Sequence, residues 1–211
     1  MDKKRYKAII YDIDGTLMDT YDRNMVPLRQ IIKEELGEEW TDAQVRKFYA
    51  QPGLKTIRDL GIQDVEGVYA RWVRYVNAYG RDAESFEGIP EVLERFREAN
   101  ILQAVVSSKM RKQYGIDMGS RGMDKYMAAA VLAEDTQKHK PDPEPILICL
   151  AKLGVEPKDA IYIGDTASDS LAARNAGVDF GLAGWGAFST EGFAPIHHYF
   201  AKPEDMLKLL E

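Results

Sequence analysis

The sequence has little cysteine and no long apolar run. Cys149 is the one cysteine among 211 residues, so no internal disulfide can form. It lies among apolar residues at helical spacing, which predicts a buried, unreactive thiol. The apolar stretch after the basic residues 3–5 is too short for a signal peptide or a membrane span. We therefore expect a cytoplasmic protein.

An excess of positive charge is also absent. Lys and Arg number 28 against 34 Asp and Glu, which gives a net charge of −6 and a pI near 5.3. This balance argues against broad attraction to nucleic-acid phosphates or anionic membranes, so we expect no nucleic-acid partner and no membrane partner. Hydrophobic residues make up 45% of the chain, enough for one compact domain or a core with an insertion. The pattern carries no signal for oligomeric state.

Strand-like apolar runs alternate with helical patterns over most of the chain. Proline suits the first turn of a helix through residues 90–100, and Gly154 ends another at 144–153. This alternation predicts an α/β fold with a doubly wound parallel sheet. The expected strands are the run that begins at Ala8, then residues 101–107, 128–131, 160–164 and 178–182.

The segment between the first strand and residue 87 has a different pattern. Amphipathic spacing predicts helices at 25–36, 54–60 and 65–79, and a capping box of Thr41 with Gln44 predicts one that begins at Asp42. No strand is expected from about residue 19 to 86. We therefore predict a helical cap domain, residues 18–86, inserted into an α/β core formed by residues 1–17 and 87–211.

Two aspartates stand at the end of the first predicted strand. Side chains at positions i and i+2 of an extended segment point the same way, so Asp12 and Asp14 are expected to converge before Gly15 breaks the strand. Two like charges held this close require a cation, a shared proton or a chemical purpose. The alternative is an ordinary strand followed by an Asp-Gly turn.

Three later segments place polar residues after or near predicted strands, where ligands bind in open parallel sheets. Ser107 follows a strand, and the next amides are expected to open a helix that can hold an anion, although serine there also serves as a simple cap. Lys140 precedes Pro141 and Pro143, which stiffen the chain around it, and Lys138 competes with it. Asp165 and Asp169 are one helical turn apart. Such oxygen-rich surroundings suit Mg²⁺, and a charged helix cap is the alternative.

The ordered set of Asp12-Ile13-Asp14-Gly15-Thr16, Ser107, Lys140-Pro141 and Gly164-Asp165 with Asp169 resembles the haloacid dehalogenase-like hydrolase superfamily. All four signature motifs match. The helical segment resembles the inserted cap of the phosphoglycolate phosphatase and β-phosphoglucomutase branch. One departure is His139, where many relatives have glycine. Nothing in the sequence gives this histidine a partner, so we expect it to be solvated or to cap a helix.

The resemblance implies a Rossmann-like core and a phosphatase mechanism. Asp12 would be the nucleophile that forms an aspartyl-phosphate, and Asp14 the general acid and base. Mg²⁺ would bind the Asp12 carboxylate, the Asp14 backbone carbonyl and Asp165, with Asp169 in support. Ser107 and Lys140 would act on the transferring phosphoryl group. The full phosphate-binding set would be Ile13, Asp14, Ser107, Ser108 and Lys140.

Several functions remain open at this point. The leading hypothesis is a Mg²⁺-dependent phosphatase acting on a small phosphorylated metabolite, and a sugar-phosphate mutase is the rival enzyme. A dehalogenase is disfavoured because Asp14 is retained. A phospho-accepting signalling module would not carry its nucleophile on the first strand, and a non-catalytic regulatory binding protein would not need the intact motif set.

Overall fold

The computed structural model describes residues 6–49, 51–80 and 83–211. Its contacts divide the chain into two compact units, Met1–Asp19 with Ser85–Glu211 and Thr20–Glu84. The division falls within three residues of the boundaries predicted from the sequence.

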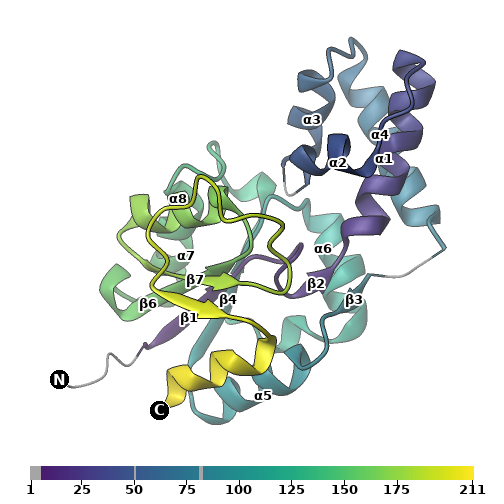
Figure 1. The fold of residues 1–211 in the computed structure, drawn as a ribbon. Helices are drawn as coiled ribbons and strands as arrows, with labels where there is room; N and C mark the ends of the chain where they lie inside the picture. The colour runs from purple at the N-terminus through teal and green to yellow at the C-terminus, as the bar shows by residue number, and fades with distance from the viewer. Residues whose placement is uncertain (1–5, 50, 81–82) are drawn as a thin grey trace. The chain divides into compact units, whose positions relative to one another are not determined.

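The larger unit contains a six-stranded sheet in the order β5-β4-β1-β6-β7-β8. Figure 1 labels β1, β4, β6 and β7 of this sheet. Every neighbouring pair in it is parallel. With the helical insert, it confirms the predicted fold class. The strands are β1 (Ala8–Tyr11), β4 (Leu102–Val106), β5 (Ala129–Val131), β6 (Ala160–Gly164), β7 (Asp179–Ala183) and β8 (His198–Phe200).

Helices cover both faces of this sheet, which explains why its central strands are apolar at nearly every position. Helices α7 (Glu144–Leu153) and α8 (Ala167–Ala176) contact one set of strands, and α5 (Ile89–Glu98) contacts β4. Alternate side chains of β1 point to opposite faces, so Ala8 and Ile10 join the core under α7 and α8. Cys149 lies in that core, where burial raises the pKa of its thiol to about 12, as expected for an inert cysteine.

The sheet brings three strand ends together at one edge. β1 pairs with β4 on one side and with β6 on the other, and these strands end at Tyr11, Val106 and Gly164. The chain runs from β1 to β4 and β5 on one side and then crosses back to β6 on the other side of β1, and this reversal creates the crevice where open parallel sheets bind ligands. The residues that follow these three strands are the predicted site residues.

In the described part of the smaller unit, every regular element is a helix except at Glu84, which belongs to a short strand. It contains α1 (Tyr21–Leu36), α2 (Asp42–Val45), α3 (Gly53–Asp59) and α4 (Val65–Ala78), with the 3₁₀ helix η1 (Arg46–Phe48) after α2. α2 begins at Asp42 as predicted but has only four residues. Inward-facing apolar residues of α1 and α4 pack into a core with aromatic residues, among them Phe48, Tyr49 and Trp72.

Three short strands were missed or excluded by the sequence pattern. β2 (Met18–Asp19) pairs with β3 (Glu84–Ser85), so the expectation of no strand from about residue 19 to 86 was wrong. Two-residue strands are too short to show alternation. β8, three residues long, adds a sixth strand at the sheet edge. The remaining elements are α6 (Arg111–Asp117) and the 3₁₀ helices η2 (Gly119–Arg121), η3 (Asp124–Tyr126), η4 (Ala133–Asp135), η5 (Pro157–Asp159) and η6 (Pro203–Leu210).

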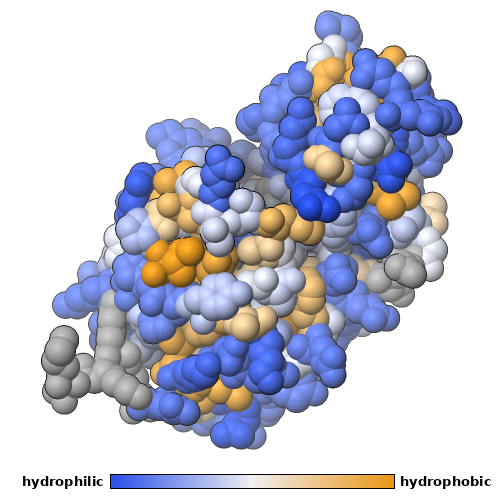
Figure 2. Space-filling model, viewed as in Figure 1, coloured by the Kyte–Doolittle hydropathy of each residue, from blue (hydrophilic) through white to orange (hydrophobic). Residues whose placement is uncertain are grey.

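The visible surface is mostly hydrophilic, with separate hydrophobic patches (Figure 2). Within the described ranges, no helix is both long enough and apolar enough to cross a membrane. The large apolar side chains that are exposed are Val26, Leu102, Leu147, Phe188, Ile196 and Tyr199.

Candidate active site

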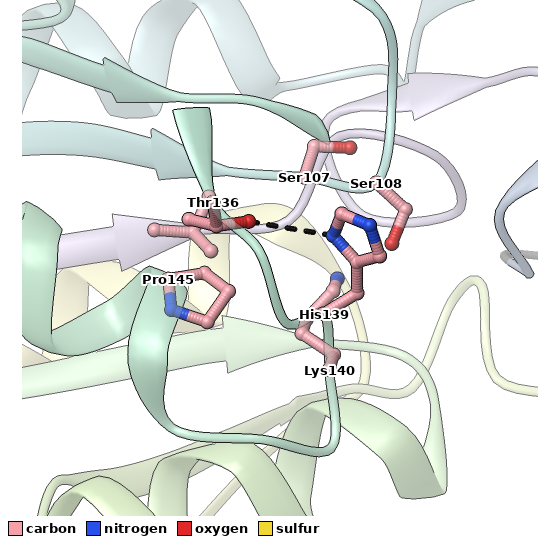
Figure 3. Close-up of a pocket in the computed structure, with 7 residues that line it drawn as sticks. Ser107, Ser108, Thr136, His139, Lys140 and Pro145 are labelled. Atoms are coloured by element: carbon pink, nitrogen blue, oxygen red, sulfur yellow. Dashed lines mark hydrogen bonds between the residues drawn. The ribbon is translucent and has the colours of Figure 1, made fainter. Parts of the chain in front are cut away.

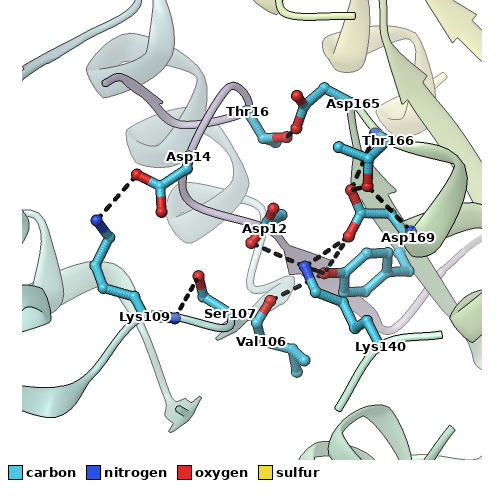
Figure 4. Close-up of polar contacts among 11 residues, drawn as sticks. Asp12, Asp14, Thr16, Val106, Ser107, Lys109, Lys140, Asp165, Thr166 and Asp169 are labelled. Carbon is cyan, nitrogen blue, oxygen red and sulfur yellow. Dashed lines mark hydrogen bonds and ion pairs between the residues drawn. The ribbon is translucent and has the colours of Figure 1, made fainter. Parts of the chain in front are cut away.

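Asp12 and Asp14 lie in a tight turn that ends β1. The Asp12 amide still donates to Ile163 O, so Asp12 continues the sheet. The carbonyl of Ile13 then accepts from three successive amides, those of residues 16, 17 and 18. This curl directs the two carboxylates to different cations: Asp12 Oδ1 lies 3.1 Å from Lys140 Nζ, and Asp14 Oδ1 lies 2.9 Å from Lys109 Nζ (Figure 4). The predicted convergence of the two side chains is therefore only partial.

Three buried carboxylates gather beyond the strand ends. Asp12, Asp165 and Asp169 each offer one ligand atom, and these atoms lie within 4.8 Å of one another. Asp12 Oδ1 is buried and, among the described residues, has the Lys140 ion pair but no hydrogen bond. Hard oxygen donors around a buried, incompletely satisfied carboxylate fit Mg²⁺. The side chain of Asp14 is not in this cluster.

Glycine is required where the turn meets Asp165. Gly15 has a φ of +80°, and a Cβ there would lie 2.2 Å from Asp165 Oδ2. The Asp165 carboxylate also accepts a hydrogen bond of 2.9 Å from Thr16 Oγ1. The turn after β1 and the end of β6 are thus packed directly against each other, and this contact fixes Asp165 beside Asp12.

The side chain of Asp169 is fully engaged with protein groups. Its Oδ2 accepts from the amide and hydroxyl of Thr166, at 3.0 and 2.6 Å, and its Oδ1 lies 2.6 Å from Lys140 Nζ. Tyr162, buried in β6, donates to Val106 O at 2.9 Å and lies 3.2 Å from the same ammonium. With both oxygens satisfied, Asp169 is suited to orienting Lys140 and supporting a metal rather than to binding one directly.

The charges of the cluster shift its proton affinities. Burial, with the neighbouring carboxylates of Asp169 and Asp14, raises the pKa of Asp12 to about 7, although Lys140 and a hydrogen bond from the Ile13 backbone act in the opposite direction. Burial likewise raises the pKa of Asp165 well above its ordinary value. Burial alone would lower the pKa of Lys140, but Asp12 and Asp169 outweigh it and raise the pKa. Carboxylates in such a site are stabilised by a bound cation.

Lys140 and Ser107 line a small pocket beside this cluster, shown in Figure 3. Lys140 has a side chain only 5% exposed, whereas Lys138 is 70% exposed and pairs with Asp142 at 3.4 Å. Geometry therefore favours Lys140 of the two lysines. The pocket is lined by Val106, Ser107, Ser108, Thr136, His139, Lys140 and Pro145.

Two details of the pocket differ from expectation. His139 was predicted to be solvated or capping, and it is partly buried with its Nδ1 3.3 Å from Thr136 Oγ1. The helix expected directly after Ser107 and Ser108 begins only at Arg111, with Met110 as its N-cap. Ser107 is therefore not the cap of that helix, and its hydroxyl accepts a long hydrogen bond of 3.4 Å from the Lys109 amide.

Several residues that support the site were not identified from the sequence. Lys109 contacts Asp14 and Asp117, yet nothing in the spacing marks Asp117 as a partner. The role of Tyr162 could have been inferred from the sequence, because a tyrosine in a buried central strand needs a hydrogen-bond partner for its hydroxyl.

The loop after β7 also braces the turn after β1. Trp185 Nε1 donates to Thr16 O at 3.0 Å, and a Cβ on Gly186 would lie 1.7 Å from Gly15 O. This loop is far from residue 15 in sequence, and no local pattern predicts the contact.

Comparisons with known proteins agree with this architecture. A family model described as haloacid dehalogenase-like hydrolase matches residues 9–183. A protein of Caldanaerobacter subterraneus subsp. tengcongensis, assigned as a pyrophosphatase PpaX, is 31% identical over 206 residues, which cover 97% of this chain and 93% of that protein. The phosphoglycolate phosphatase of Aquifex aeolicus is 28% identical over 211 residues, 97% of each chain.

A solved structure shows the same fold over nearly the whole chain. It is a Lactobacillus plantarum protein assigned as a phosphoglycolate phosphatase, with a TM-score of 0.88 and 31% identity, and the match covers 97% of this chain and 99% of that one. The resemblance found in the four motifs is confirmed. The chain belongs to the haloacid dehalogenase-like hydrolase family and is an enzyme of its phosphatase class.

Proposed function

We propose that the protein is a Mg²⁺-dependent phosphatase that hydrolyses a small phosphorylated metabolite through an aspartyl-phosphate on Asp12. The observation that carries this proposal is the buried Asp12 carboxylate, held between Lys140 on one side and Asp165 on the other. A nucleophile, a cation and a site for a metal are thereby placed around one small volume. Phosphoryl transfer to a carboxylate requires these three groups.

In the proposed reaction, an oxygen of Asp12 attacks phosphorus and the bond to the leaving oxygen breaks. Lys140, which is buried and stays protonated, neutralises charge on the phosphoryl oxygens, and the Ser107 hydroxyl donates to them. Backbone amides at Ile13 and Asp14, with Ser108, complete the proposed phosphate contacts. Asp14 gives a proton to the leaving oxygen and later takes one from the water that attacks the phosphoenzyme.

The proposed metal ligands are the Asp12 and Asp165 carboxylates and the Asp14 backbone carbonyl, with Asp169 in support. When bound, Mg²⁺ supplies positive charge that lowers the repulsion between Asp12 and the incoming phosphate. Thr16 keeps Asp165 in place for this role through its hydrogen bond.

The substrate class is proposed from the relatives. Proteins that align with nearly the full length of the chain are named pyrophosphatase and phosphoglycolate phosphatase, both hydrolases of small anionic phosphates. We therefore favour a phosphatase over the sugar-phosphate mutase. Phosphoglycolate and inorganic pyrophosphate are the first compounds to compare, because the same residues can act on either.

We also propose that the helical unit, residues 18–86 by the sequence boundaries, acts as a substrate-selecting cap. Replacing residues 20–84 with a short Gly/Ser linker is expected to reduce discrimination between phosphoglycolate and 4-nitrophenyl phosphate while leaving Mg²⁺ affinity largely intact. Unchanged discrimination in the folded deletion variant would contradict a selecting role.

The direct test measures phosphate release from 4-nitrophenyl phosphate with and without Mg²⁺. We expect release that depends on Mg²⁺ and falls by orders of magnitude in Asp12→Asn. Asp124→Asn makes the same chemical change at an exposed position and is expected to retain activity. Well-folded, Mg²⁺-loaded protein that releases no phosphate from 4-nitrophenyl phosphate, phosphoglycolate or pyrophosphate would contradict the proposed function.

A further inference from the structure

A second buried charge cluster lies next to the proposed catalytic one. Lys109 Nζ is 2.9 Å from Asp14 Oδ1 and 2.7 Å from Asp117 Oδ2 (Figure 4 shows the contact with Asp14). The side chains of Lys109 and Asp117 are 5% and 1% exposed, and that of Asp14 is 16% exposed. The Lys109 ammonium thus bridges the partly exposed carboxylate of Asp14 and the buried carboxylate of Asp117.

The bridge costs free energy to build. Burial by itself lowers the pKa of Lys109, but Asp14 and Asp117 outweigh it and raise the pKa, so the lysine stays charged. Buried ion pairs often contribute little net stability compared with well-packed apolar groups. A buried chain of two carboxylates and one lysine is therefore better explained by what it positions than by what it stabilises.

Backbone and side-chain contacts hold both supporting residues in place. The carbonyl of Lys109 accepts from the Ala133 amide at 3.1 Å, which ties it to the residues after β5. Asp117 lies in α6 and its Oδ1 accepts from Gln113 Nε2 at 2.9 Å. The remaining freedom of the ammonium is limited by its two carboxylate partners. Asp14 is consequently held by a fixed group rather than by a mobile surface lysine.

We propose that Lys109, anchored by Asp117, is a positioning residue that holds the Asp14 carboxyl apart from the Asp12, Asp165 and Asp169 cluster and oriented toward the leaving oxygen. This inference rests on the proposed function. Without Lys109, the Asp14 carboxyl loses the ion pair at Oδ1 that sets this orientation. Proton transfer needs the acid within hydrogen-bond reach, so a change in this orientation slows it.

The step that depends on this arrangement is the first one. Asp12 forms a bond to phosphorus, the bond from phosphorus to the leaving oxygen breaks, and that oxygen takes the bond's electron pair and the proton from the Asp14 carboxyl. The product is a free alcohol or phenol, and Asp14 is left as a carboxylate. Water then attacks phosphorus and returns a proton to Asp14, which releases inorganic phosphate and restores Asp12.

The test compares two substrates of similar shape in Lys109→Met, a variant of similar length without the charge. A stable 4-nitrophenolate can leave unprotonated, whereas the more basic phenolate of phenyl phosphate needs the acid. We expect kcat/KM for phenyl phosphate to fall by about 100-fold or more, the lower end of typical general-acid effects, and to fall several-fold at most for 4-nitrophenyl phosphate. Asp117→Asn is expected to lower the ratio of kcat/KM for phenyl phosphate to kcat/KM for 4-nitrophenyl phosphate as well, but by a smaller factor.

Matched variants keep this test decisive. Lys112→Met removes an exposed lysine from α6, the helix that carries Asp117, and is expected to leave the ratio of the two kcat/KM values unchanged. If Lys109→Met fails to fold, the double variant Lys109→Met/Asp117→Asn removes both buried charges and is expected to show the same selective loss. An equal fall for both substrates, or no fall, in a folded variant would overturn the inference. A folded wild-type protein with Mg²⁺ that releases no phosphate from these two substrates, phosphoglycolate or pyrophosphate would instead overturn the proposed function, and the inference with it.

Discussion

Replacing the proposed nucleophile is expected to stabilise the metal-free protein at alkaline pH. Asp12 is buried beside Asp165 and Asp169, and its pKa is raised from 3.8 to about 7, first by burial and then by the neighbouring carboxylates. The folded protein therefore holds this proton to a higher pH than the unfolded chain does. Stability is consequently lost as pH rises from about 4 to about 7. Asp12→Asn removes this loss because the amide never ionises.

The size of the effect follows from the shift in pKa. A difference of about 3 units corresponds to about 4 kcal/mol at pH 8, at 1.36 kcal/mol per unit, and to about 2 kcal/mol at pH 5. Loss of the Lys140 contact subtracts from this gain, although Lys140 keeps Asp169 as a partner at 2.6 Å. We expect a net gain of about 2 to 4 kcal/mol at pH 8, or about 5 to 15 °C in Tm for a chain of this size.

The assay is thermal unfolding with EDTA at pH 5 and pH 8, repeated with saturating Mg²⁺. Free Mg²⁺ at 100 times its Kd is expected to stabilise the wild-type protein by about 2.7 kcal/mol and Asp12→Asn by less. The metal is therefore expected to reduce the difference in Tm between the two proteins. Asp124→Asn is the control and is expected to change stability by less than about 0.5 kcal/mol at either pH. A Tm for Asp12→Asn at or below the wild-type value at pH 8 without metal would contradict the expected destabilisation by the ionised Asp12 carboxylate.

Three further substitutions test the supports of the site. Thr16→Val removes the hydrogen bond that lowers the pKa of Asp165, and titration calorimetry is expected to show about 10-fold weaker Mg²⁺ binding; unchanged affinity would count against Asp165 as a ligand. Gly186→Ala places a Cβ 1.7 Å from Gly15 O and is expected to lower both Tm and phosphatase activity, whereas Gly115→Ala, with open space around it, is expected to lower neither. Tyr162→Phe leaves the buried Val106 carbonyl without its donor and is expected to cost about 1 to 3 kcal/mol in urea unfolding; a neutral result would show that this hydrogen bond adds no net stability.

The α/β core was predictable because its local signals agree with its final packing. The strand at Ala160–Gly164 and the helix at Glu144–Leu153 were predicted with the boundaries the structure shows. Each is apolar, and the helix ends at Gly154 with a φ of +66°. The parallel sheet then places every predicted motif at one edge, because all its strands run in the same direction.

Contacts between distant segments were not predictable from local pattern. β8 is three residues long and begins at the second of two histidines that carry no strand signal, and it joins the sheet through pairing with β7. The bridge from Asp14 through Lys109 to Asp117 joins a strand end to a helix, and the loop around Gly186 meets Gly15 across more than 150 residues of sequence. Such contacts depend on tertiary packing, which leaves no periodic trace in either segment.

The most direct test of the central claim is a rapid acid quench of the enzyme during turnover of 4-nitrophenyl [³²P]phosphate with Mg²⁺, followed by peptide mapping. The account predicts an acid-stable, hydroxylamine-sensitive phosphoryl label on the peptide that contains Asp12, and no label in Asp12→Asn. Turnover that depends on Mg²⁺ and proceeds with the label on another residue, or with no label at any quench time, would contradict it.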